Sequence, residues 1–175
     1  MALLVHSHVP VDRSEVPWAL RAGAISGIGA GIVFAVFEMV ASAAMMGAGA
    51  SFMPLRMIGA ILLGPGALDP SYSIWAAGAA GLIVHLALSV VYGAVFAMIL
   101  GGLRSATWDV LLGAAFGFAL WLINFYLIAP MAFPWFLDAN PVIQFVAHTI
   151  LFGAVLGWLM WRSRESATPI GEAGV

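Results

Sequence analysis

Charged side chains divide the chain into long apolar stretches. Residues 22–55 carry one charge, at Glu38, and residues 70–103, 110–137 and 139–161 carry none. Each stretch exceeds the ~20 residues that a helix needs to cross the hydrocarbon core of a bilayer. The pattern therefore predicts four transmembrane spans, near 22–48, 74–100, 108–130 and 141–161.

A shorter apolar stretch lies in the connector between the first two predicted spans. It is too short to cross a membrane, and it ends at the helix-breaking pair Pro65 and Gly66. We expect a short helix near 54–63 that lies on the outer membrane face or dips into it. Arg56 would then reach a lipid phosphate or a neighbouring carboxylate.

The composition agrees with a membrane protein. Of 175 residues, 63% are hydrophobic and 8% are charged, and the mean hydropathy is +1.07, whereas about a quarter of the residues of a soluble domain are charged. The alternation of a transmembrane β-barrel is missing, and open sheets cannot face lipid. The predicted fold class is an all-α integral membrane four-helix bundle over residues 21–162, with an N-terminal lead at 1–20 and a tail at 163–175.

All six basic residues are arginines, and their distribution predicts the orientation of the chain. In a four-span topology Arg56 lies on one side of the membrane, and the other five lie on the opposite side: Arg13, Arg21, Arg104, Arg162 and Arg164. Positive residues favour the cytoplasmic side, so we expect both termini in the cytoplasm. The first residues have too short an apolar core for a secretory signal, so the first span should remain in the mature chain.

Several functional classes are disfavoured by what the sequence lacks. There are no cysteines, which removes disulfides, thiolate metal sites, iron–sulfur clusters and covalently attached haem. The net charge of −2 gives no reason to expect nucleic acid as a partner. Neither an HExxH motif nor a second intramembrane carboxylate is present, and a hydrolase built on Ser89 and His85 lacks a recognisable oxyanion site. The sequence therefore leans away from an enzyme.

A glycine face in the first span leads to its one charged residue. Gly23, Gly27 and Gly31 are spaced four residues apart, and Glu38 follows Gly31 on nearly the same side of a helix. Small residues at this spacing allow two membrane helices to pack closely, so this face should meet another helix. An acid directed into such an interface is a candidate functional site.

The third span repeats this arrangement. Adding 86 to the numbers of Gly27, Gly31 and Glu38 gives Gly113, Gly117 and Asn124. The spans that follow each copy contain one interior histidine, His85 and His148 respectively. We therefore predict a pseudo-two-fold repeat of two helical hairpins, related by an axis along the membrane normal.

Four polar residues should share one depth in the membrane. Glu38, His85, Asn124 and His148 each lie roughly 13 to 16 residues, or about 20–24 Å, from the cytoplasmic end of their spans. One such residue per helix predicts a polar layer on the outer side of the bilayer centre. Hydrogen-bonding neighbours are placed to extend it: Ser42, Ser89, Tyr92 and Gln144.

Three functions remain open for this layer. It could bind or relay a proton or a small ion, in which case four helices are few for a complete path and a homo-oligomer or a larger membrane complex is expected. It could instead hold a cofactor, either a single Zn or Fe(II) ion or a haem b with His85 and His148 as axial ligands. In the third case the polar side chains only hold the helices together. Several methionines lie near this layer: Met39, Met45, Met46, Met53 and Met57. Their thioether groups could bind Cu(I) or could simply fill apolar space.

Several segments carry a resemblance to a known family: MPLRMIGAILLGPGAL, HLALSVVYG, FGFALWLINFY, FPWF and AHTILFG. Over roughly residues 22–161 the chain resembles a small family of four-span bacterial inner-membrane proteins, mostly uncharacterised, some of which carry a sodium:proline symporter label. The resemblance implies a bacterial inner-membrane location and four helices, and it supplies no activity or site residue. The symporter label fits poorly, because such transporters need many more helices.

Overall fold

The structure is a computed structural model that describes residues 16–100 and 105–167. Most of the predicted N-terminal lead, the end of the tail, Arg13 and Arg104 lie outside these ranges. Within them the regular elements are all helical, and four helices are long and apolar enough to cross a membrane: Val16–Met46, Ile74–Leu100, Ala106–Ala132 and Pro141–Ser166. The prediction of an all-α fold with four helices long and apolar enough to span a membrane is confirmed for the described residues.

The long helices differ in regularity. The first two are continuous α-helices, α1 (Val16–Met46) and α3 (Ile74–Leu100). The third runs through α4 (Ala106–Ile123), the π-helical segment η3 (Asn124–Ile128) and α5 (Ala129–Ala132). The fourth runs through α6 (Pro141–Val146), the π-helical segment η5 (Ala147–Ala154) and α7 (Val155–Ala167).

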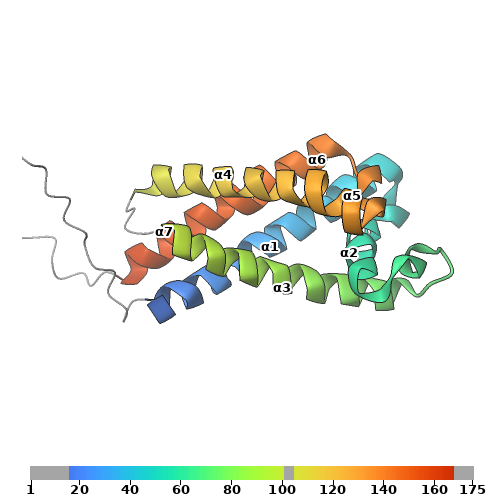
Figure 1. Cartoon of the computed structure of the whole chain (residues 1–175), viewed down its shortest axis with the longest axis horizontal. Helices are drawn as coiled ribbons and strands as arrows, with labels where there is room; N and C mark the ends of the chain where they lie inside the picture. The colour runs from blue at the N-terminus through green and yellow to red at the C-terminus, as the bar shows by residue number, and fades with distance from the viewer. Residues whose placement is uncertain (1–15, 101–104, 168–175) are drawn as a thin grey trace, which may run out of the picture.

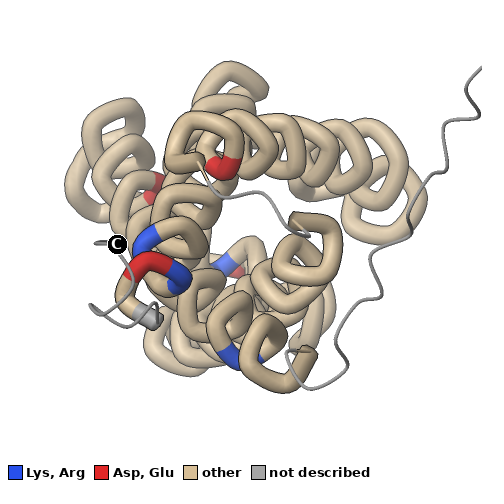
Figure 2. Tube along the Cα trace, turned by 90° about the vertical axis from the view of Figure 1, so that its left-hand side faces the viewer, with Lys and Arg blue, Asp and Glu red and all other residues tan. Residues whose placement is uncertain are grey.

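The four long helices run side by side and alternate in direction (Figure 1). The start of α1, the end of α3, the start of α4 and the end of α7 lie at one end, which we call the arginine end because Arg21, Arg162 and Arg164 lie there. The opposite, loop end carries the short elements: η1 (Ala48–Ala50), α2 (Met53–Leu63), η2 (Pro65–Leu68) and η4 (Pro134–Asp138). Viewed along the bundle axis, charged residues occupy only a few positions of the trace (Figure 2).

Close glycine contacts join α1 to α3. A Cβ atom on Gly27 would overlap the carbonyl oxygen of Ser89, and one on Gly93 would overlap that of Gly23. Only residues without a side chain allow backbones to approach this closely. The predicted glycine face of the first span therefore packs against the second span.

A second set of glycine contacts joins α4 to the fourth long helix. Added Cβ atoms on Gly113 and Gly117 would overlap the carbonyl oxygens of Gly153 and His148. In the opposite direction, a Cβ on Gly157 would overlap the carbonyl of Asp109. The long helices are thus assembled as two tightly packed pairs.

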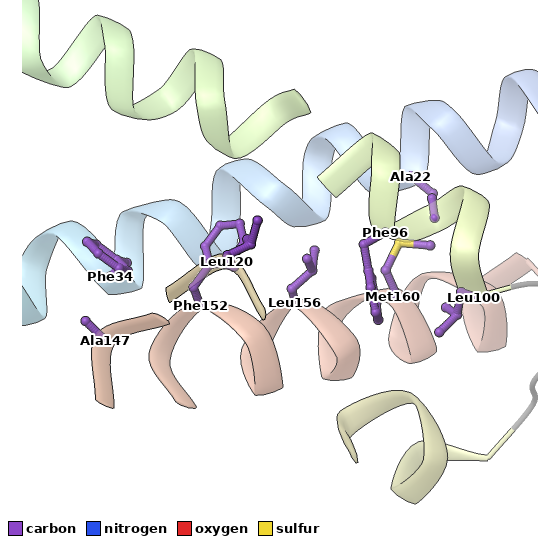
Figure 3. Close-up of a cluster of buried hydrophobic side chains, with 11 residues drawn as sticks. Ala22, Phe34, Phe96, Leu100, Leu120, Ala147, Phe152, Leu156 and Met160 are labelled. Carbon is purple, nitrogen blue, oxygen red and sulfur yellow. The ribbon is translucent and has the colours of Figure 1, made fainter. Parts of the chain in front are cut away.

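Apolar side chains fill the space between the two pairs (Figure 3). Phe96, Leu100, Leu156 and Met160 are the most completely buried large side chains of this core. Outward-facing residues are also apolar, and Val40, Ile83 and Met98 are each more than 60% exposed, which suits contact with lipid. The core contains Ala22, Ala30, Phe34, Phe96, Ala97, Leu100, Leu120, Ala147, Phe152, Leu156 and Met160.

A buried ion pair holds the second helix pair at the arginine end. Asp109, near the start of α4, is completely buried and pairs with Arg164 of α7. Ser105 caps the same end of α4 by accepting a hydrogen bond from the amide of Trp108 at 3.2 Å. Burial of a carboxylate is tolerated here because a cation lies against it.

At the loop end, Arg56 of α2 is directed into the protein. Its side chain is buried, and its Nη2 donates a hydrogen bond to the carbonyl oxygen of Tyr72 at 2.8 Å. The expected contact of Arg56 with a lipid phosphate or a neighbouring carboxylate stays a prediction, and the bond to Tyr72 is a contact that the sequence did not predict. Asp69 lies nearby, where hydrogen bonds from the hydroxyl and the amide of Ser71, together with the charge of Arg56, lower the pKa of its carboxyl group.

Candidate functional site

A cavity of about 980 Å³ occupies the loop end of the bundle. Its wall includes residues of α1, α2, α3, η3 and η5 and of the loop at 133–141. The wall contains every polar residue that we proposed from the sequence: Glu38, Ser42, His85, Ser89, Tyr92, Asn124, Gln144 and His148. They come from all four long helices, so the cavity is the place where the two helix pairs meet around polar groups.

The carboxylate of Glu38 is only half satisfied. Its Oε2 accepts a hydrogen bond from Nε2 of Gln144 at 2.8 Å, which links α1 to α6. Its Oε1 is buried and accepts no hydrogen bond within the described residues, and the side chain as a whole is 6% exposed. Burying a carboxylate oxygen without a hydrogen-bond donor is unfavourable. A proton, a cation or a hydrogen-bond donor of a ligand would therefore be stabilised at this atom.

The side chain of His85 is hydrogen-bonded to the neighbouring helix. Its Nε2–H donates to the carbonyl oxygen of Gly31 at 2.8 Å, and the residue is 8% exposed. A Cβ on Gly31 would overlap Ser89 Oγ and lie 3.5 Å from Nε2 of His85. Gly31 therefore provides both the acceptor and the space, and His85 serves first to join α3 to α1.

His148 is held within its own helix. Its Nδ1–H donates to the carbonyl oxygen of Gln144 at 2.9 Å, so Nε2 carries the lone pair of the neutral ring. The ring is half-buried and packs edge-on against Phe34 and Phe125, at centroid separations of 4.9 and 5.6 Å. A backbone bond to Nδ1 is the usual way in which a histidine is oriented to use Nε2 as a base or a ligand.

Both π-helical segments coincide with site residues. η3 begins at Asn124, and η5 contains His148. A π-turn inserts one extra residue into the helical ladder and redirects the side chains around it, and such turns are frequent at functional sites. The distortion of the second helix pair is therefore located at the cavity wall.

Glu38 makes no hydrogen bond to either histidine of the predicted polar layer. Glu38 bonds instead to Gln144, and the two serine hydroxyls donate to backbone carbonyls: Ser42 to Ala50 and Ser89 to His85, each at 2.7 Å. Hydroxyls prefer nearby carbonyls of their own chain segment because these acceptors require little ordering. Tyr92 faces the side chain of Asn124, so these two residues form a separate polar contact in the wall.

The geometry does not favour the cofactors considered from the sequence. Among the described residues, no group of three or more His, Cys, Asp or Glu side chains is arranged to hold a metal ion. His85 and His148 both pack against the ring of Phe34, and Nε2 of His85 is bonded to Gly31. A haem between the two histidines would require His85 to give up this bond. Of the methionines, Met45, Met46, Met53 and Met57 line the cavity.

Sequence reasoning missed the aromatic part of the site. Phe34 contacts both histidines, and Phe125 contacts His148. Trp135 links the loop at 133–141 to α2 by donating from Nε1 to the carbonyl oxygen of Met57 at 3.1 Å. The position of Phe34 could have been predicted, because it lies four residues before Glu38 and hence on the same helical face. No comparable signal marks the contact between Trp135 and Met57, which are far apart in the sequence.

Comparison of the chain with protein-family models, with curated proteins and with solved structures finds no match. The side chains of the cavity are therefore the basis on which a function is proposed.

Proposed function

We propose that Glu38 is an intramembrane site that binds and releases a proton or a small cation, reached through the cavity from the loop end. The observation that carries this proposal is the unpartnered Oε1 of a buried carboxylate in the wall of a large cavity. Acidic side chains inside a membrane carry a large desolvation cost, and they typically belong to ion or proton pathways. Gln144 orients the carboxylate by bonding to its other oxygen.

The charges of the cavity wall support a cationic occupant. The wall contains the carboxyl groups of Glu38 and Asp138, and it contains no lysine or arginine among the described residues. The lone pair on Nε2 of His148 supplies a second position that can accept a proton.

We further propose a bacterial inner-membrane location with both termini in the cytoplasm. Arg21, Arg162 and Arg164 lie at one end of the bundle and Arg56 at the other, which supports a cytoplasmic arginine end under the positive-inside rule. The cavity then opens toward the outer side, and α2 is an interfacial helix there. The resemblance to four-span inner-membrane proteins supports the same location.

The two helix pairs are proposed to be copies of one hairpin. In support, Gly27 and Gly113 occupy matching positions in the sequence, and both meet a glycine or serine carbonyl of the following long helix. We also propose that the protein acts as a homo-oligomer or as an accessory subunit of a larger complex. The wide exposed apolar surface leaves room for such a partner as well as for lipid.

A purely structural role is favoured for one residue of the layer. His85 bonds a backbone carbonyl across the α1–α3 contact, which is what a residue that only holds helices together would do. Glu38 differs, because half of its hydrogen-bonding capacity is unused.

Infrared difference spectroscopy of the purified protein in lipid nanodiscs tests the proton site. A protonated carboxyl group has a C=O stretch that disappears on ionisation. We expect a C=O band at the high frequency of a carboxyl group in apolar surroundings, which is lost as the pH rises and is absent from Glu38→Gln. The matched control is Glu165→Gln, at an exposed acid near the arginine end. If the high-frequency band is unchanged in Glu38→Gln, or is missing from the wild-type protein at every pH, the proposal is contradicted.

A further inference from the structure

We infer that the cavity binds a hydrophobic organic cation, which replaces the proton on Glu38. This inference rests on the proposed function and names the class of ligand for the same site. It combines three properties of the wall: its size, the sign of its charge and its aromatic and thioether surface.

The size of the cavity exceeds what a proton or a metal ion needs. Its volume of about 980 Å³ lies at the upper end of the ~300–1,000 Å³ that is typical of small-molecule sites. A proton relay requires only a file of hydrogen-bonding groups, and the serine hydroxyls that might have formed one are bonded to backbone carbonyls. The volume therefore indicates a molecule of many atoms.

The electrostatics select a cation over an anion. The titratable groups in the wall are the two acids Glu38 and Asp138, the two histidines and Tyr92, and no lysine or arginine of the described chain reaches it. The Oε1 atom of Glu38 is buried and without a donor. A positive ligand beside it would compensate a carboxylate that is otherwise costly to bury, whereas an anion would add to the cost.

The lining selects an organic cation over a hydrated metal ion. Hard cations such as Ca²⁺ need six to eight oxygen ligands and favour carboxylates, and Glu38 and Asp138 are the only acidic residues of the wall among the described residues. Aromatic faces attract desolvated cations, and methionines adapt to irregular apolar shapes. Both kinds of surface are present, the aromatic one in Phe34, Phe125 and Trp135 and the thioether one in Met45 and Met57.

Proton and ligand compete for one carboxylate in this scheme. When the cation enters, Glu38 ionises and releases one proton to solvent, so the net charge at the site is the same before and after exchange. Acidification must therefore weaken binding, by about tenfold per pH unit in the range where Glu38 is protonated in the empty site.

Tetraphenylphosphonium is a suitable probe, with tetraphenylborate as an anion of matched size and shape. Calorimetry on the full-length protein in detergent would measure affinity at several pH values, and a repeat in buffers of different ionisation enthalpy would count the protons released. We expect saturable binding of the phosphonium, about one proton released per cation, and at least tenfold weaker binding of the borate. Glu38→Gln should bind the phosphonium at least tenfold more weakly, and Glu165→Gln should match the wild type.

Each outcome decides the proposal. Equal binding of the two probes, or binding that does not change with pH in the wild-type protein, overturns it without requiring any variant to fold. If Glu38→Gln is unstable, Glu38→Asp, which retains the charge, should bind more tightly than Glu38→Gln solubilised under the same conditions, and equal binding overturns the proposal. If the phosphonium does not bind while the infrared band of Glu38 still titrates, the organic-cation inference is wrong and the proton site stands.

Discussion

The two helix pairs use their histidines in opposite ways. In the α1–α3 pair both helices are regular, and His85 bonds to Gly31 of the partner helix. In the second pair the helices contain π-turns at the site, and His148 bonds only to Gln144 of its own helix. The first pair thus carries Glu38 on a regular helix, whereas the second pair contributes Gln144, which bonds to the carboxylate, and His148, whose Nε2 is left as an acceptor. Residues that look alike in sequence can therefore differ in function.

The largest expected effect comes from removing the ion pair that joins α4 to α7 at the arginine end. Asp109→Asn removes the buried carboxylate that pairs with Arg164. We expect a loss of about 3 kcal/mol in the free energy of unfolding, at the low end for a broken buried pair because Arg164 is partly exposed. Titration of folded protein with denaturing detergent would measure it, with Glu165→Gln as the exposed control. A loss below about 0.5 kcal/mol would show that the pair does not hold this end together.

The first pair can be disrupted by adding one methyl group. In Gly27→Ala the new Cβ would overlap the carbonyl oxygen of Ser89, so α1 and α3 must move apart. We expect a destabilisation of about 1–3 kcal/mol, measured by the same unfolding titration. Gly49→Ala is the matched control, because a Cβ there meets nothing within 4 Å. Equal stability of the two variants would contradict the close packing of the first pair.

Replacing each histidine in turn sharpens the contrast between the pairs. His85→Gln removes a bond between two helices, and we expect it to cost about 1 kcal/mol of folding free energy. His148→Gln removes a bond within one helix, so the expected loss is smaller, about 0.5 kcal/mol. Phosphonium binding should respond in the opposite order, with the larger change in His148→Gln. If His85→Gln changed binding more while leaving stability intact, the roles assigned to the two residues would be reversed.

A small and local effect is expected at the link between the loop and α2. Trp135→Phe keeps an aromatic ring but removes the hydrogen bond to the carbonyl oxygen of Met57. We expect a loss of about 0.5–1 kcal/mol and faster amide hydrogen exchange in α2 and residues 133–140. Exchange in α1 and α3 should be unchanged. Uniformly faster exchange over the whole bundle would mean that the bond supports global folding and not the local attachment of the loop to α2.

Much of the fold follows from the sequence, because the lengths of charge-free stretches and the positions of glycines determine it directly. The short helix expected near 54–63 corresponds to α2, Met53–Leu63, and the glycine face of α1 meets α3. Spacing along four antiparallel helices also placed Glu38, His85, Asn124 and His148 near one another. These features depend on distance along a helix, which a sequence encodes directly.

The partners of the polar groups could not be predicted in the same way. The pairing of Glu38 with Gln144, and the bonds from Ser42 and Ser89 to backbone carbonyls, depend on side-chain rotamers and on small differences between competing acceptors. The π-turns at Asn124 and His148 arise from packing between helices, because no residue type specifies them locally. The bond from Arg56 to the carbonyl oxygen of Tyr72 could not be predicted for the same reason, since this acceptor becomes available only in the folded connector.

Labelling by a hydrophobic carbodiimide tests the central claim most directly. Such reagents add to protonated carboxyl groups in apolar surroundings, and mass spectrometry of peptides locates the adduct. The account predicts an adduct on Glu38 that forms faster at lower pH, is slowed by tetraphenylphosphonium and is absent at this position in Glu38→Gln. Labelling of other acids with Glu38 left unmodified in the wild-type protein would contradict a protonatable carboxyl group exposed to the cavity.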